Sequence, residues 1–186
     1  MTHALHTLNQ AGRDEALALL SPLVERSAWV AEDTLGARPF ADDEAVAQAL
    51  VETILVSGAA RRLALFRVHP ELAGREAMSG DMTAESKGEQ GRLGLMSLGR
   101  RDAQHLTRLN AAYRARFGHP FIIALHRVPD LGALFAIFER RCAATPLEEH
   151  VSTLAEIASV IRARAAATFG PTRPSSPSSQ TQEHVQ

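Results

Sequence analysis

Apolar residues recur along most of this chain at steps of three and four, the spacing of a helix that buries one face. One example is the stripe formed by Val46, Leu50, Ile54 and Leu55. Alanine, leucine, glutamate and arginine are common, while β-branched and aromatic residues are sparse, and this composition favours helix over strand. The expected helical segments are 15–25, a stretch from 42 or 43 through 55, 83–95, 102–117, 130–142 and 146–161.

Residues typical of helix ends stand at the ends of these segments. Asp42 or Asp43 can cap the second helix, Thr83 the third and Asp130 the fifth. Short polar side chains at such positions accept hydrogen bonds from the first free N–H groups of a helix. Gly118 follows the fourth segment and is typical of a helix stop. The end signals and the periodicity therefore indicate the same helices.

The run from Phe121 to Leu125 is ambiguous, because five apolar residues after a proline could form a short strand or a buried helical segment. No second strand candidate is present to pair with it, so we expect a helix or an extended buried loop. The segment from Gly74 to Asp81 is predicted to be a loop. Together these features predict an all-α protein, a compact multi-helix single domain over residues 1–169.

The end of the chain has a different composition. From Gly170 onward it is rich in proline and serine and has almost nothing to bury in a core. We expect residues 170–186 to form a flexible tail.

Charge and cysteine content exclude several classes of protein. The 186 residues include 20 Lys and Arg against 21 Asp and Glu, so no field of one sign would attract nucleic acid or an anionic membrane. No apolar run is long enough to cross a membrane, and the first residues lack the pattern of a secretory signal. The single Cys142 excludes an internal disulfide and suits a reducing compartment. We expect a cytoplasmic protein with neither nucleic acid nor membrane as a partner.

His69 is the first candidate for chemistry. It precedes Pro70, and a residue before proline is biased away from the helical conformation, which places the histidine at a helix boundary. An ordinary imidazole pKa of about 6.5 allows proton donation and acceptance near neutral pH. A surface or capping histidine would fit the same dipeptide. No His or Cys spacing typical of a metal site is present.

Ser86, Glu89 and Gln90 form the second candidate. Ser-x-x-Glu is also the pattern of a capping box, and taken alone it favours capping somewhat over catalysis. Gln90 has no task in such a cap. Farther along, Asn110 and Tyr113 stand at helical spacing, which indicates core packing with one buried hydroxyl group.

The order and spacing of these motifs resemble the family of OHCU decarboxylases (2-oxo-4-hydroxy-4-carboxy-5-ureidoimidazoline decarboxylases). The resemblance rests on His-Pro-Glu-Leu-Ala-Gly at 69–74, Ser-Lys-Gly-Glu-Gln at 86–90 and the run at 110–123. It spans roughly Leu5 to Ala165 and includes shorter matches at 26–30, 38–40 and 138–141. It implies an all-α fold and a carboxy-lyase that converts OHCU to (S)-allantoin in urate degradation without a cofactor.

The resemblance also implies a site. His69 matches the catalytic histidine, and Glu89 matches a glutamate that is important for catalysis. An arginine of the last helix completes the site, for which Arg164 fits best and Arg162 is the alternative. The implied substrate-binding residues are Pro70, Ser86, Gln90, Phe121, Ile122, Ile123, Ala124 and Leu125. The implied partner is the small-molecule substrate, no metal site is implied, and a homodimer is expected because relatives in the family form dimers.

One position departs from the family, which usually has Phe-Gly-Phe-Pro-Phe where this chain has His119 in the middle. We expect this histidine to face solvent, the alternative being a polar group at the rim of the pocket. A competing interpretation of the whole chain is a non-catalytic helical protein that binds a small molecule or another protein. The combination of His69, Glu89 and Arg164 favours the enzyme, provided that the three side chains meet in one enclosed pocket.

Overall fold

The computed structural model describes residues 2–74 and 83–171, and this part of the chain contains helices and no β-strand. The expected all-α class is confirmed. The predicted flexible tail beyond residue 171, and the predicted loop beyond Gly74, lie outside the described residues. The elements in order are α1 (His3–Gln10), α2 (Arg13–Leu20), η1 (Ser21–Leu23), α3 (Ala28–Thr34), η2 (Leu35–Ala37), α4 (Asp43–Val56), α5 (Ala59–Arg67), α7 (Ala84–Arg92), η3 (Leu95–Ser97), α8 (Arg100–Phe117), η4 (Leu125–Arg127), α9 (Leu131–Cys142) and α10 (Pro146–Phe169), where η marks a 3₁₀ turn.

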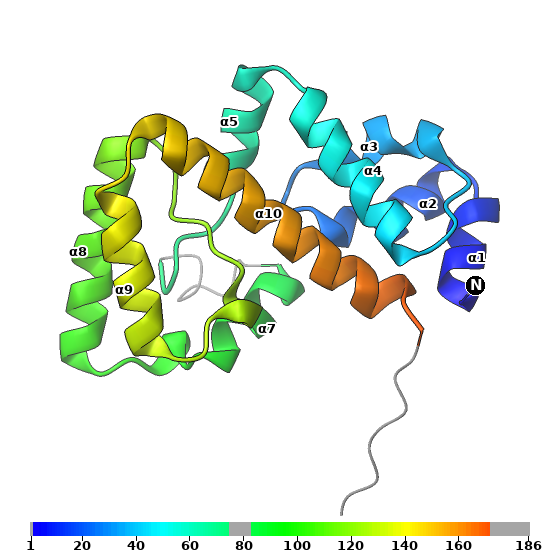
Figure 1. Cartoon of the computed structure of the whole chain (residues 1–186). Helices are drawn as coiled ribbons and strands as arrows, with labels where there is room; N and C mark the ends of the chain where they lie inside the picture. Colours follow the sequence, from blue (N-terminus) through cyan, green and yellow to red (C-terminus); the bar gives the residue numbers. More distant parts are fainter. Residues whose placement is uncertain (1, 75–82, 172–186) are drawn as a thin grey trace, which may run out of the picture.

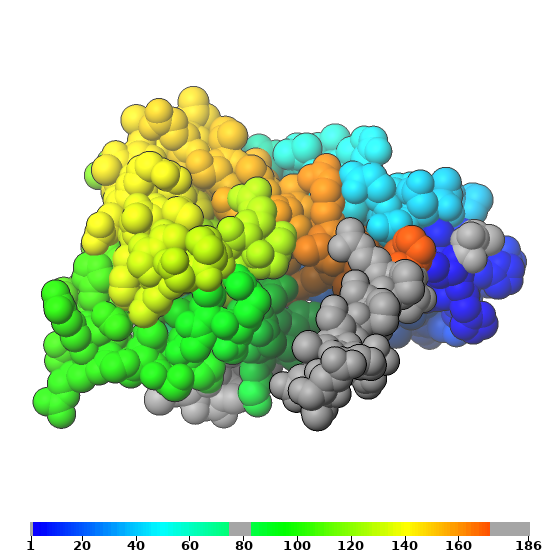
Figure 2. Space-filling view, turned by 60° about the horizontal axis from the view of Figure 1, so that its bottom comes forward, coloured from blue at the N-terminus to red at the C-terminus, as the bar shows by residue number. Residues whose placement is uncertain are grey.

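The long helix α10 runs diagonally across the molecule and separates two groups of helices (Figure 1). On one side α1 to α4 gather around its second half, and α4 makes the most extensive contact with it. On the other side α8 and α9 pack against each other near its first half. A space-filling view shows α10 emerging between the N-terminal helices and the elements from α7 to α9 (Figure 2). The helix α10 is therefore the wall that both groups share.

The apolar core follows the same division. One cluster joins α1 to α5 with α10 through side chains such as Leu50 and Ile161. A second cluster joins α8, α9 and the segment that precedes η4. In that segment Ile122 packs into the first cluster, whereas Phe121 and Ile123 pack into the second. The segment is an extended buried loop, one of the two conformations expected from the sequence, and its alternating side chains connect the two clusters.

The predicted helix ends are largely confirmed. Asp42, Thr83 and Asp130 each accept a hydrogen bond from a backbone N–H in the first turn of α4, α7 and α9. Gly118 ends α8 in the left-handed conformation, with φ of 75°. The last helix begins with a capping box, in which Thr145 and Glu148 satisfy each other's backbone N–H groups.

Four expectations about helices are wrong in detail. The segment predicted as a helix over 15–25 leaves the α conformation after Leu20 and continues as η1, where Pro22 has no N–H to extend the pattern. Leu55 does not belong to the buried stripe of α4: it is 51% exposed, because it lies about 100° around the helix from buried Ile54. The helix predicted over 83–95 ends at Arg92, and Leu95 belongs to η3 after Gly94, which has φ of 65°. The short helices α1, α3 and α5 were not predicted. None of the helices in the described residues has the length and apolar character needed to cross a membrane.

Candidate functional site

His69 lies just beyond the end of α5, as its position before Pro70 predicts. Its Nδ1 is 2.8 Å from the carbonyl oxygen of Leu65. A carbonyl only accepts hydrogen bonds, so the neutral ring carries its proton on Nδ1 and presents the lone pair of Nε2. Burial lowers the pKa of His69 to about 4, against the opposing effects of the Leu65 carbonyl and the charge of Glu25. At neutral pH this histidine is therefore a proton acceptor.

The residues after His69 are held by α7 and α8. The side-chain oxygen of Gln90 accepts from the N–H of Ala73 at 2.9 Å, and its amide nitrogen donates to the carbonyl of Glu71 at 3.4 Å. Asn110 donates to the carbonyl of Leu72 at 2.9 Å. These contacts explain why the motifs at 69–74, 86–90 and 110–123 occur together.

The end of this segment requires a glycine. Ala73 adopts the left-handed conformation with φ of 48°, which few residues other than glycine adopt. At Gly74 a Cβ atom would lie 2.7 Å from the Cβ of Glu71. The tight turn after His69 therefore accounts for the glycine of the motif.

The capping interpretation of Ser86 is not what the structure shows. Thr83 caps α7, and Ser86 lies in its first turn with the side chain buried. The Ser86 hydroxyl donates to the carboxylate of Glu25 at 2.7 Å. Glu89, one helical turn later, binds Arg164 of α10, whose Nε and Nη2 donate to its two oxygens at 2.9 and 3.1 Å.

Arg164 is the centre of this polar group. Besides the two bonds to Glu89, its Nη2 lies 3.4 Å from the Ser86 oxygen and its Nη1 lies 3.3 Å from the carbonyl of Pro22. Nη1 also lies 3.5 Å from Glu25. Its side chain is only 10% exposed. The five N–H donors of the guanidinium are thus directed at protein oxygens in this structure.

Glu25 is a residue of the site that the sequence did not reveal. It lies between η1 and α3 and is buried, and the next residue, Arg26, has φ of 42°. Non-glycine residues in this conformation are strained and gather at functional sites. The only signal in the sequence was its place beside the match at 26–30, because the periodicity assigned Glu25 to the end of a helix.

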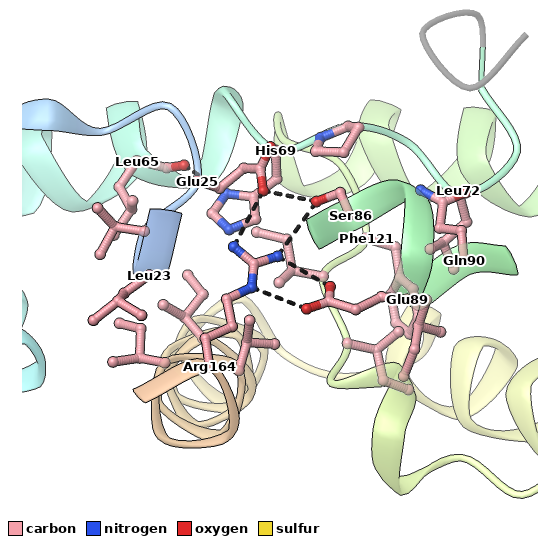
Figure 3. A pocket seen from close by; sticks show the side chains of 18 of the residues that line it. Leu23, Glu25, Leu65, His69, Leu72, Ser86, Glu89, Gln90, Phe121 and Arg164 are labelled. Atoms are coloured by element: carbon pink, nitrogen blue, oxygen red, sulfur yellow. Dashed lines mark hydrogen bonds and ion pairs between the residues drawn. The ribbon is translucent and has the colours of Figure 1, made fainter. Parts of the chain in front are cut away.

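These side chains meet in one pocket (Figure 3). Glu25, His69, Ser86, Glu89 and Arg164 line it, and Figure 3 shows the imidazole beside the guanidinium of Arg164. The empty space of the pocket, including the open solvent at its mouth, is about 600 Å³. Its apolar wall draws on both core clusters and includes Leu23, Leu65 and Ile161 from the first and Leu72, Phe121 and Ile123 from the second. Pro70 and Gln90 also line it.

The extended segment after Pro120 forms another part of the wall. Phe121, Ile122, Ile123 and Leu125 line the pocket, whereas Ala124 does not. The Ile122 carbonyl accepts from Arg141 at 2.7 Å, and the Ala124 N–H donates to Glu156 at 2.8 Å. Within residues 2–74 and 83–171, the N–H groups of Ile122 and Ile123 donate to no protein acceptor. The segment is therefore held in place by Arg141 and Glu156, while the N–H groups of Ile122 and Ile123 are available to a ligand.

The alternative arginine and the unusual histidine both have clear positions. Arg162 pairs with Glu44 on the surface at 3.0 Å, so Arg164 is the arginine that faces the pocket. His119 does not face solvent, as we had expected: it is 4% exposed and packs against the rings of Phe66 and Tyr113. Burial lowers its pKa. This neutral ring occupies the aromatic environment in which the family usually has phenylalanine.

Known proteins resemble this chain over most of its length. The sequence model of the OHCU decarboxylase family matches residues 9–166. The 2-oxo-4-hydroxy-4-carboxy-5-ureidoimidazoline decarboxylase of Amia calva is 32% identical over 160 residues, which cover 86% of this chain and 91% of that protein. The corresponding protein of Haloferax volcanii is 32% identical over 166 residues, or 89% of this chain and 95% of its own.

Two solved structures share the fold. The crystal structure of an OHCU decarboxylase in the presence of (S)-allantoin has a TM-score of 0.64 at 17% identity, over 86% of this chain and 100% of that one. The crystal structure of an (S)-allantoin synthase has a TM-score of 0.66 at 23% identity, over 88% of this chain and 53% of that one.

Proposed function

This chain belongs to the OHCU decarboxylase family, and we propose that its pocket removes the carboxyl group of OHCU to give (S)-allantoin in urate degradation. The observation that supports this most strongly is the meeting of His69, Glu89 and Arg164 in one pocket. They come from the end of α5, from α7 and from α10. A histidine that accepts protons beside a fixed carboxylate and a guanidinium is suited to acid–base chemistry on a small polar molecule.

The chemistry follows from the structure of the substrate. In OHCU, carbon 4 carries both a hydroxyl and a carboxyl group, and carbon 5 carries the ureido group. When the bond to the carboxylate breaks, carbon dioxide leaves and the electron pair of that bond moves onto the ring nitrogen that is doubly bonded to carbon 5. That nitrogen takes up the proton that the reaction consumes. The hydroxyl group then loses its proton to become a carbonyl, and a proton adds to carbon 5. Overall one proton is consumed, and addition from one face gives a single enantiomer.

We assign the proton transfers to His69. Its Nε2 takes the proton of the substrate hydroxyl and returns it to carbon 5 on the same face. The hydrogen bond from Nδ1 to Leu65 supports this role, because it fixes the orientation of the ring and the position of its lone pair.

Glu89 and Arg164 act as a pair in this proposal. The side chain of Glu89 is 30% exposed, against 2% for Glu25, so Glu89 is the carboxylate better placed to accept an N–H of the substrate. Arg164 orients Glu89 through two hydrogen bonds. Its positive charge also lowers the cost of bringing an anionic substrate to a pocket with two carboxylates.

The remaining residues place the substrate. We propose that the free N–H groups of Ile122 and Ile123 bind its carbonyl oxygens, and that Phe121, Leu125 and Pro70 supply apolar contact. Ser86 contributes a polar contact. Gln90 acts mainly by holding the residues after His69, since its amide is engaged with Glu71 and Ala73.

A stereospecific assay tests the function. Freshly prepared urate-oxidation product is supplied to the purified protein, and the optical activity of the allantoin is followed against a protein-free control. We expect allantoin to form faster than in the control and to be the S enantiomer. Racemic allantoin at the spontaneous rate would favour the alternative of a non-catalytic binding protein.

We also propose that the protein is a cytoplasmic homodimer. The single cysteine suits a reducing compartment, and the dimer is implied by the family resemblance. Light scattering on the purified protein should give twice the 20.1 kDa of the chain; the mass of one chain would contradict the dimer. Fractionation of cells tests the compartment.

A further inference from the structure

Glu25 is a buried carboxylate of the pocket to which the proposed reaction assigns no step. It is 3% exposed. One of its oxygens accepts the Ser86 hydroxyl at 2.7 Å, and both lie 3.3 Å from the hydroxyl of Thr83. Arg164 is its counter-ion, at 3.5 Å. Figure 3 shows Glu25 next to Ser86 and Arg164, joined to both by dashed lines.

This arrangement fixes the direction of the Ser86 hydroxyl. A carboxylate can only accept hydrogen bonds, so Ser86 must donate its single proton to Glu25. The serine oxygen then has only lone pairs for other partners, and it already receives one N–H of Arg164 at 3.4 Å. Thr83 donates to Glu25 in the same way and accepts from the N–H of Ser86.

We propose that Glu25 is a positioning residue that sets the hydrogen-bond polarity of Ser86, so that this corner of the pocket takes an N–H donor, such as a ureido or amide group. A carbonyl or carboxylate oxygen at the same place would meet the lone pairs of Ser86, with the charge of Glu25 directly behind them. Glu25 thereby orients the substrate, with its ureido end at Ser86 and its carboxyl end elsewhere. This inference rests on the proposed function.

Glu25→Gln separates this role from packing, because glutamine has nearly the same size. Its amide can donate to the Ser86 oxygen and release the hydroxyl proton toward the pocket, which inverts the polarity. We expect the KM for OHCU to rise about tenfold, the effect of one well-made hydrogen bond. We expect kcat to change less than about threefold, since His69 and Glu89 remain in place.

A double-mutant cycle with Ser86→Ala decides whether Glu25 acts through the serine. In the Ser86→Ala background, Glu25→Gln should leave KM unchanged. Equal effects of Glu25→Gln in both backgrounds, or a loss confined to kcat, would overturn the proposal. Glu44→Gln is the matched control, because it breaks an exposed glutamate–arginine pair between α4 and α10 and should change neither constant.

A second measurement applies if Glu25→Gln does not fold. (S)-Allantoin and hydantoin, which lacks the ureido group, are compared as inhibitors of the unaltered protein and of Ser86→Ala. Allantoin should inhibit the unaltered protein at a concentration about tenfold lower than hydantoin does. In Ser86→Ala the inhibitory concentrations of the two compounds should become equal. Equal inhibition of the unaltered protein would overturn the proposal. A protein with no stereospecific turnover would instead contradict the proposed function.

Discussion

Two arginine–glutamate groups connect α10 to the rest of the fold, and they differ in what they leave for a ligand. Arg141 of α9 binds Glu149 of α10, with side chains only 7% and 0% exposed. Arg164, fifteen residues farther along α10 than Glu149, binds Glu89 and Glu25 at the pocket. The chemistry of the pairs is the same, so their surroundings must account for any difference in role.

The Arg141 group is closed. Glu149 accepts from Arg141, from Thr153 and from the hydroxyl of Tyr113. Burial, together with the bond to Glu149, raises the pKa of Tyr113 far above its ordinary value. Arg141 also donates to the Ile122 carbonyl. All these partners belong to the protein, and the group can serve only to hold the helices and the segment together.

The Arg164 group is open. Glu89 is partly exposed to the pocket, and His69 beside it presents a lone pair with no partner in the described part of the chain. A buried ion pair by itself is weak evidence of function, because many such pairs are structural. We infer from the comparison that a histidine with an unused acceptor and a neighbouring pocket distinguish the pair proposed to act on the substrate from the structural one.

The largest effect should come from the open group. His69→Asn removes the proton acceptor and keeps a polar side chain of similar size. Positioned acid–base groups contribute about 10²- to 10⁴-fold in rate, so we expect kcat to fall by at least about 100-fold. The midpoint of thermal unfolding should stay within a few degrees. Near-normal turnover would exclude His69 from the mechanism.

Substitutions in the closed group of Arg141 and Glu149 should lower the free energy of unfolding. Glu149→Gln leaves the charge of Arg141 buried without its counter-ion, and breaking such a pair typically costs about 3–5 kcal/mol. We expect a loss of this size in the free energy of unfolding, measured with urea. The double variant Arg141→Met with Glu149→Leu should recover much of it, because an apolar pair of similar volume removes the uncompensated charge.

The same double variant sharpens the contrast. The double variant lacks the donor to the Ile122 carbonyl. If Arg141 positions the segment from Phe121 to Leu125, the double variant should therefore have a raised KM even where its stability is restored. Full recovery of both stability and KM would show that the closed group has no part in placing the substrate.

A smaller change probes the geometry of the open group. Arg164→Lys keeps the charge but cannot hold both oxygens of Glu89, because an ammonium group lacks the planar fork of donors. We expect kcat/KM to fall about tenfold, the effect of one lost hydrogen bond. Arg162→Lys on the same helix alters an exposed pair and is the control. Equal kinetics in the two variants would contradict a positioning role for Arg164.

The sequence predicted the long helices well because periodicity and end signals agree there. Asp130 and Gly118 stand where α9 begins and α8 ends. The short helices α1, α3 and α5 were missed because few turns give little periodicity, and tertiary packing stabilises them instead. His119 was misjudged for a related reason: its polarity suggested solvent, whereas its surroundings are the aromatic rings of the core.

The residues of the site likewise fall into those that the sequence indicates and those that only the folded structure reveals. His69, Ser86, Glu89 and Arg164 could be proposed from the motifs by resemblance, and the structure brings them together. Glu25 could not, because its role depends on contacts with residues about sixty and more positions away, such as Ser86 and Arg164. Local patterns carry no information about such contacts. The hydrogen bond that fixes the tautomer of His69 is likewise a property of the folded chain alone.

The smallest expected effect is the change of kcat/KM with pH, and it depends on His69 alone. Burial lowers the pKa of His69 to about 4, and the neutral form is the active base. Activity is therefore lost as the pH falls through this pKa, and kcat/KM, which reports the free enzyme, should change less than about twofold between pH 8 and pH 6. A histidine with the ordinary pKa of about 6.5 would lose about three quarters of its base form over the same range.

Unfolding reports the same titration with a defined sign. The unfolded chain binds a proton at His69 near pH 6.5 and the folded protein only near pH 4, so this group makes the free energy of unfolding decrease as the pH falls between these values. His69→Asn should flatten that dependence. His119→Phe removes a second histidine whose pKa is lowered by burial, and it should flatten the stability profile in part while the acid limb of kcat/KM stays below pH 5. An activity profile with a midpoint near pH 6.5 would mean that the pocket does not hold His69 neutral, and the distinction between an open and a closed group would lose its electrostatic basis.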